Sequence, residues 1–241
     1  METLELKNKT VADVVKENIK TAHVFKKFGI DFCCGGGKKI EDVCKKNNID
    51  IVALEDEIHY ALSTNAPSVN YNNWSLDFLC DYIEQTHHNY VKEAIPIIKS
   101  YAERVAKVHG DASPETIEIK NLFDKVVAEL IPHMQKEELI LFPYIKKMVK
   151  VKKEGLDTVH ASFGNVNNPI QMMMHEHDAV GDLFKLISKL SNQYTAPDWA
   201  CNTYKALYAK LEEFENDLHL HIHLENNILF VKTLAFERLN N

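Results

Sequence analysis

The sequence lacks any apolar run approaching the roughly 20 residues that a membrane-spanning helix needs, and its N-terminus has no basic start followed by an apolar block. It therefore shows neither a membrane anchor nor a signal peptide. Its five cysteines are an odd number and mostly scattered, which suits a reducing cytoplasm better than a disulfide scaffold. A net charge of −7 argues against a protein that follows nucleic-acid phosphates. We expect a cytoplasmic protein that binds neither nucleic acid nor membrane.

The 241 residues can hold one large domain or two smaller ones. No segment has a confident strand pattern, so we expect an all-α fold. Residues 1–62 predict a small helical domain, and residues 63–74, rich in Asn and Ser, predict a linker. From residue 75 to 241 four long helical patterns follow, with short connections that predict an antiparallel four-helix bundle. These patterns cover about 75–108, 113–150, 169–192 and 197–238, the last starting near Pro197-Asp198.

A ten-residue pattern occurs twice in these helices. His133 is followed four residues later by Glu137, and His221 is followed in the same way by Glu225. The two copies lie 88 residues apart, and both continue with Ile, Leu and Phe at matching positions. Residues four apart share one face of a helix. The repeat therefore predicts a duplicated helical hairpin whose two halves build one metal site.

The buried faces of the helices select among the twelve histidines. In the third helix the apolar periodicity places His177 inward rather than His175. In the fourth helix it places His221 inward and leaves His219 and His223 on flanks or outer faces. These faces predict that His133, His177 and His221 approach one another inside the bundle.

The first long helix leaves a choice between two adjacent histidines. Its apolar stripe, read as a straight helix, centres on His87 and places His88 at the edge. The repeat does not decide between them, because an offset of 88 residues pairs His87 with His175 and an offset of 89 pairs His88 with His177.

An inward histidine is most often an ordinary core residue, whereas a buried and unpaired carboxylate is costly. Several histidines and two glutamates in one core are best explained by a cation. Mixed imidazole and carboxylate ligation suits iron, manganese or zinc, but structural zinc favours four ligands and cysteine. Four histidines and two glutamates suit two ions bridged by the carboxylates. We expect two iron ions, with manganese as the alternative.

Motifs in both halves of the chain resemble the repair-of-iron-centres family, the ScdA/YtfE proteins, whose bundle is hemerythrin-like. They are Asp31-Phe32-Cys33-Cys34-Gly35-Gly36, His133-Met134 with Lys136-Glu137-Glu138 and Ile140-Leu141-Phe142-Pro143, Glu176-His177-Asp178 with Gly181, and His221-Ile222 with Leu224-Glu225-Asn226-Asn227 and Leu229-Phe230. The resemblance implies terminal ligands and bridging carboxylates at six positions. The terminal ligands are His88, His133, His177 and His221, with His87 as the alternative to His88, and the bridges are Glu137 and Glu225.

The resemblance implies a function in repairing iron–sulfur clusters damaged by nitric oxide or oxidants. A labile two-iron centre would donate iron to damaged iron–sulfur proteins, its clients. The alternatives are an enzyme that reduces NO at the same centre and a hemerythrin-like module that binds or senses O2 or NO. A metal-free helical adaptor is a further alternative. The resemblance also allows a homodimer.

Three residues outside the ligand set carry weaker predictions. Cys33 and Cys34 lie beside three glycines, which predict an exposed loop with a redox or NO-binding role. A mobile N-terminal domain would bring this loop to the bundle. Glu129 lies one helical turn before His133 and is predicted to orient a ligand or relay protons.

Overall fold

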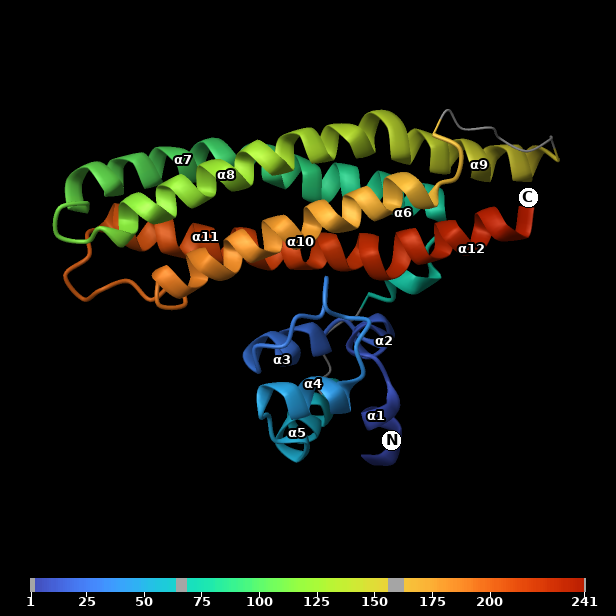
Figure 1. Cartoon of the computed structure of the whole chain (residues 1–241), viewed down its shortest axis with the longest axis horizontal. Coiled ribbons are helices and arrows are strands. Elements are labelled where there is room, and N and C mark those ends of the chain that lie inside the picture. The colour runs from blue at the N-terminus through green and yellow to red at the C-terminus, as the bar shows by residue number, and fades with distance from the viewer. Residues whose placement is uncertain (1–2, 64–68, 156–162, 241) are drawn as a thin grey trace.

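The computed structural model describes residues 3–63, 69–155 and 163–240. Within these ranges the elements of secondary structure are helices, and one isolated antiparallel β-bridge pairs Thr10 with Lys39. Four long helices lie side by side, and a cluster of short N-terminal helices packs beneath them (Figure 1). The expected all-α fold is confirmed. None of the helices in the described ranges has the length and apolar character needed to cross a bilayer.

Each long helix is continuous over most of the bundle, and three of them are interrupted by one π-helical segment. The first comprises α6 (Leu76–Tyr82), η2 (Ile83–His88) and α7 (Asn89–His109). The second comprises α8 (Glu115–Lys136), η3 (Glu137–Leu141) and α9 (Phe142–Glu154). The third is α10 (Asn167–Leu190), and the fourth comprises α11 (Asn202–His223), η4 (Leu224–Leu229) and α12 (Phe230–Asn240).

The fourth helix starts later than the expected Pro197-Asp198. The Ala200 N–H donates to the Pro197 carbonyl at 2.9 Å, which closes a separate turn. Cys201 then has an extended backbone and precedes the first helical residue, Asn202. Cys201 is exposed at this helix start.

Aromatic side chains hold the four helices together at one end of the bundle. Phe214 on α11 is fully buried. Its ring stacks on Phe184 of α10 at 5.6 Å, meets Phe123 of α8 edge-on at 5.6 Å, and lies 6.1 Å from Tyr90 of α7. One ring therefore contacts side chains from the other three helices.

The five N-terminal helices are short, and they are α1 (Thr3–Asn8), α2 (Val11–Glu17), α3 (Thr21–Lys27), α4 (Ile40–Asn47) and α5 (Ile51–Ser63). The Thr10 side chain caps α2 by accepting from the Asp13 N–H at 3.1 Å. Lys26 joins this cluster to the bundle through a 2.8 Å ion pair with buried Glu215. Of the expected linker, residues 64–68 lie outside the described residues, and Tyr71–Asn73 form the short 3-10 helix η1.

We predict that Phe214→Ala lowers the free energy of unfolding by about 3–5 kcal/mol, because it removes a ring shared by all four helices and leaves a cavity. Urea unfolding followed by circular dichroism measures the change. The matched control is Leu139→Ala, whose side chain is 75% exposed and whose loss should cost less than about 0.5 kcal/mol. Equal effects of the two substitutions would contradict this account of the bundle core.

Candidate metal centre

A layer of polar side chains separates two hydrophobic clusters of the bundle. One cluster contains Phe214 and the N-terminal helices, and the other contains Phe142 and Phe230. The layer between them contains six residues that are at most 2% exposed. They are His88, His133, Glu137, His177, His221 and Glu225. All six predicted ligand positions therefore come together, from all four long helices.

The six side chains form two groups of potential metal donors that share both glutamates. His88 and His221 belong to one group and His133 and His177 to the other, and the donor atoms within each group lie within 4.8 Å of one another. Glu225 Oε1 lies 3.1 Å from His221 Nε2, while its Oε2 lies 3.1 Å from His177 Nε2. This carboxylate therefore faces both groups, one oxygen to each.

The second shared carboxylate lies across the layer. Glu137 Oε2 is 3.4 Å from His88 Nε2 and 3.3 Å from His133 Nε2. His133 Nε2 and His177 Nε2 approach to 3.0 Å. All four imidazoles thus present Nε2 to the interior of the layer.

The opposite ring nitrogens explain this orientation. His88 Nδ1 lies 2.8 Å from Glu138 Oε1, and His133 Nδ1 lies 2.9 Å from Glu176 Oε2. An ionised carboxylate can only accept, so each Nδ1 carries the proton and leaves the Nε2 lone pair free. The same arrangement is found around many histidine-bound metal ions. His177 Nδ1 has a neutral partner, Asn226 Oδ1, at 2.9 Å.

Lysines hold the two outer carboxylates in place. Lys92 donates to Glu138 at 2.7 Å, and Lys136 donates to Glu176. Hydrogen bonds from His133 and Lys136 lower the pKa of Glu176 to about 2. The sequence did not predict these contacts of Glu176 with His133 and Lys136. The signal was adjacency, because Glu138, Glu176 and Asn226 each lie next to a predicted ligand in the chain.

The buried polar atoms of the layer fit a cation. Both oxygens of Glu137, Oε2 of Glu225 and Nε2 of His88 have no hydrogen-bond partner among the described residues, although such atoms are rarely left unsatisfied. Burial raises the pKa of Glu225, but the nearby imidazoles of His221 and His177 outweigh this effect and hold that pKa well below its ordinary value. These carboxylates need nearby positive charge to stay ionised. Metal ions bound by the donor atoms of the layer would supply it.

The π-helical segments explain which histidine of the first helix faces the layer. A π turn holds more residues than an α turn, so the buried face moves along the sequence. In η2 the buried positions therefore run from Ile83 to His88 and on to Val91. His88 belongs to a donor group and His87 does not. His87 is also buried, where its Nδ1 lies 2.9 Å from Asp217 and its ring stacks on His221 at 5.4 Å.

The prediction for Glu129 is wrong. The residue is exposed, and the buried face of α8 passes through Leu130 at that turn. Successive residues point about 100° apart around a helix, so Glu129 is directed away from the layer. The π turn of η3 likewise buries Leu141 and leaves the neighbouring Ile140 on the surface.

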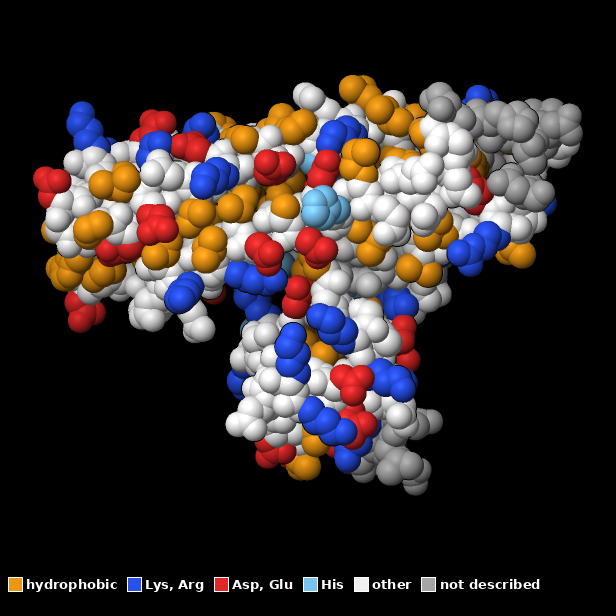
Figure 2. All heavy atoms as spheres, viewed as in Figure 1, with side chains coloured by type: hydrophobic (Ala, Val, Ile, Leu, Met, Phe, Trp, Pro, Cys, Tyr) orange, Lys and Arg blue, Asp and Glu red, His pale blue; other side chains and the backbone are white. Residues whose placement is uncertain are grey.

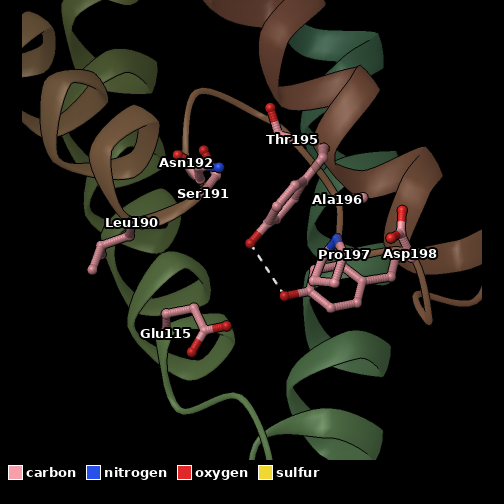
Figure 3. A pocket seen from close by; sticks show the side chains of 10 residues that line it. Glu115, Leu190, Ser191, Asn192, Thr195, Ala196, Pro197 and Asp198 are labelled. Atoms are coloured by element: carbon pink, nitrogen blue, oxygen red, sulfur yellow. Dashed lines mark hydrogen bonds between the residues drawn. The ribbon is translucent and has the colours of Figure 1, made fainter.

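A cavity of about 340 Å³ lies at the end of α10, where the chain turns into α11. Figure 3 shows its lining, with the 3.2 Å hydrogen bond between the hydroxyls of Tyr204 and Tyr208. None of the six donors lines it, so the metal-binding chemistry belongs to the buried layer instead.

Comparison with known families agrees with this geometry. Residues 82–232, which include all six donors, match the hemerythrin HHE cation-binding domain. Residues 7–62 match ScdA_N, a domain of unknown function.

Relatives match nearly the whole chain. The iron–sulfur cluster repair protein ScdA of Staphylococcus epidermidis is 32% identical over 94% of this chain and 98% of its own length. The iron–sulfur cluster repair protein YtfE of Yersinia pseudotuberculosis is 32% identical over 97% of this chain and 100% of its own. The chain belongs to the ScdA/YtfE family. A probable iron–sulfur cluster repair protein of Haemophilus influenzae, 35% identical over 88% of this chain and 90% of its own, is a further relative.

The cysteine pair of this ScdA/YtfE chain is less exposed than the neighbouring glycines predict. Cys33 is buried and Cys34 is half-buried. The Phe32 ring before them packs 5.9 Å from His219 and 5.8 Å from His223. His223 is consequently buried, and its predicted place on an outer face is wrong, because the N-terminal helices cover that face.

We predict that Glu176→Gln weakens metal binding about 10–100-fold, since the amide keeps the size of the side chain but removes the charge that orients His133. Competition with a chelator, using Zn²⁺ as the probe, measures the affinity. Glu129→Gln is the control and should bind as the wild type does. Unchanged affinity in Glu176→Gln would show that the outer carboxylate does not support the ligand.

Proposed function

We propose that this chain holds two iron ions in the buried layer and uses them to repair damaged iron–sulfur clusters. His88, His133, His177 and His221 would be terminal ligands, and Glu137 and Glu225 would bridge. The sharing of both glutamates between the two donor groups supports this assignment. Manganese suits the same ligand types and is the alternative.

The whole-chain match to proteins named for iron–sulfur cluster repair carries the functional proposal. The ligand set suits a donor of iron for three reasons. It uses no thiolate, it places neutral imidazoles at four positions, and both negative ligands are shared between ions. Carboxylate and imidazole ligands hold a metal only while they are deprotonated, so protonation of the shared glutamates would release iron. Iron would be the cargo, and damaged iron–sulfur proteins would be the recipients.

The alternatives of NO reduction and of O2 or NO binding use the same layer. Each would need an exchangeable position on the metal, which the ligand count leaves open. The binding of NO or O2 stays a prediction of the sequence, as do a homodimer and a cytoplasmic location. The redox or NO-binding role of Cys33 and Cys34 also stays a prediction.

We predict about two coupled iron ions per chain after anaerobic loading, measured by metal analysis and Mössbauer spectroscopy. Glu225→Gln should lose most of this iron, because it removes the carboxylate that faces both groups. Asp178→Asn, a neighbouring but exposed position, should load normally. One ion per wild-type chain, or zinc in place of iron, would contradict the bridged centre.

Isotope labelling can distinguish iron donation from removal of NO as the mechanism of repair. Protein loaded with ⁵⁷Fe is incubated anaerobically with a [4Fe–4S] protein whose cluster has been damaged by NO. We predict that the label enters the restored cluster and that Glu137→Gln, which cannot hold the iron, restores nothing. Restoration without transferred label would contradict iron donation and favour removal of NO by the centre.

A further inference from the structure

The loop between α3 and α4 contains a second group of potential metal ligands. We propose that Asp31, Cys33 and Cys34 form a separate site for a divalent transition-metal ion. One donor atom from each residue lies within 4.8 Å of the others. Cys33 Sγ is 3.2 Å from Asp31 Oδ1 and 4.0 Å from Cys34 Sγ. None of these residues belongs to the buried layer of the bundle, so the site goes beyond the proposed repair centre.

The backbone of the loop arranges these donors before any metal binds. Asp31 Oδ1 accepts from the N–H groups of Cys33 at 3.1 Å and Cys34 at 3.0 Å. This turn places both thiols beside the carboxylate. The loop is tightly packed at its glycines, because a Cβ at Gly36 would lie 2.4 Å from the Phe32 carbonyl oxygen and 2.9 Å from Ala12 Cβ. Glycine allows the loop to close tightly, and the donors are therefore preorganised.

The bundle holds this loop in place. Asn227 Nδ2 donates to the carbonyl oxygens of Phe32 at 3.3 Å and Cys33 at 3.0 Å. On the other side, a Cβ at Gly181 would come within 4.0 Å of Cys34 Sγ. Gly181 is one helical turn beyond His177, and Asn227 lies two residues beyond Glu225. The loop thus lies against α10 and η4, which supply His177 and Glu225 to the buried layer.

The charges of the loop favour a cation. Burial raises the pKa of Asp31, but hydrogen bonds from the Gly35 backbone and Cys33 and the charge of Lys185 outweigh it, so the carboxyl is ionised. The Cys34 side chain, burial and the Asp31 charge raise the pKa of the Cys33 thiol well above its ordinary value. Lys185 lies 3.9 Å from Asp31 but is bound to Asp182 at 2.8 Å. A bound divalent ion would reverse the repulsion and stabilise the thiolates.

The donor types identify the class of ion. Two thiolates and one carboxylate suit Fe²⁺, Zn²⁺ or Co²⁺ rather than Mg²⁺ or Ca²⁺. Three protein ligands leave a further position open, as in sites that exchange their metal or bind a fourth ligand. Binding would release the two thiol protons to solvent without any change of oxidation state. Figure 2 shows basic and acidic side chains gathered where the N-terminal helices meet the bundle.

Anaerobic titration of the full chain with Co²⁺ tests the proposal. Cobalt bound to thiolate gives a charge-transfer band in the near ultraviolet, whereas the six donors of the layer contain no sulfur. We expect a band that saturates at about one cobalt ion per chain and is lost in Cys34→Ser and Cys33→Ser. Asp31→Asn keeps the hydrogen-bond acceptor of the turn and should weaken cobalt binding by about tenfold or more.

The controls separate this site from the rest of the protein. Cys201→Ser removes the exposed cysteine, whose Sγ lies 3.4 Å from His109 Nε2, and should keep the band. Glu225→Gln should also keep it, so failure of the bundle centre does not affect this test. The circular dichroism of each variant verifies folding, and the half-buried Cys34 is the position that best tolerates serine. A wild-type chain without the band, or a band that depends on Cys201, would overturn the proposal.

Discussion

The burial of two carboxylates inside the bundle is the constraint on which the rest of the structure depends. Glu137 and Glu225 are fully buried, and an unpaired charge in such a place costs several kcal/mol. Four imidazoles surround them, and the pKa values of two of these rings, His88 and His133, are raised. The Glu137 charge accordingly offsets the effect of burial and raises the pKa of His133 to about 10. Metal ions can supply the same positive charge through the same donor atoms, so one arrangement accounts for both the stability of the layer and its chemistry.

The π-helical segments allow these side chains to meet. His88, Glu137 and Glu225 all lie within such segments. A wider turn changes which residues face inward after it, so each helix can present apolar residues to one hydrophobic cluster, a polar residue to the layer, and apolar residues again to the other cluster. An uninterrupted α-helix would keep one stripe throughout. The interruptions therefore align the layer with two separate cores.

The sequence predicted what depends on regular periodicity. The repeated His and Glu pairs, the inward positions of His177 and His221, and the helical bundle follow from spacing that α-helices conserve. It could not decide between His87 and His88, because a π turn leaves no simple mark in the residue pattern. It failed at Glu129 for a related reason, since a position four residues from a ligand is inward only when the buried face passes through it. The burial of Cys33 depends on contacts between segments far apart in the chain, which local composition does not contain.

The repeat makes the two halves of the layer similar but not equal. Glu138 follows Glu137 as Asn226 follows Glu225, and each contacts Nδ1 of a histidine on the preceding helix. The first partner is a charged carboxylate and the second a neutral amide, and a carboxylate partner makes an imidazole the stronger ligand. His221 Nδ1, by contrast, has no hydrogen-bond partner among the described residues. Its orientation comes from stacking on His87 and from Glu225. The two metal positions therefore differ through these outer contacts, although the ligand types at both are the same.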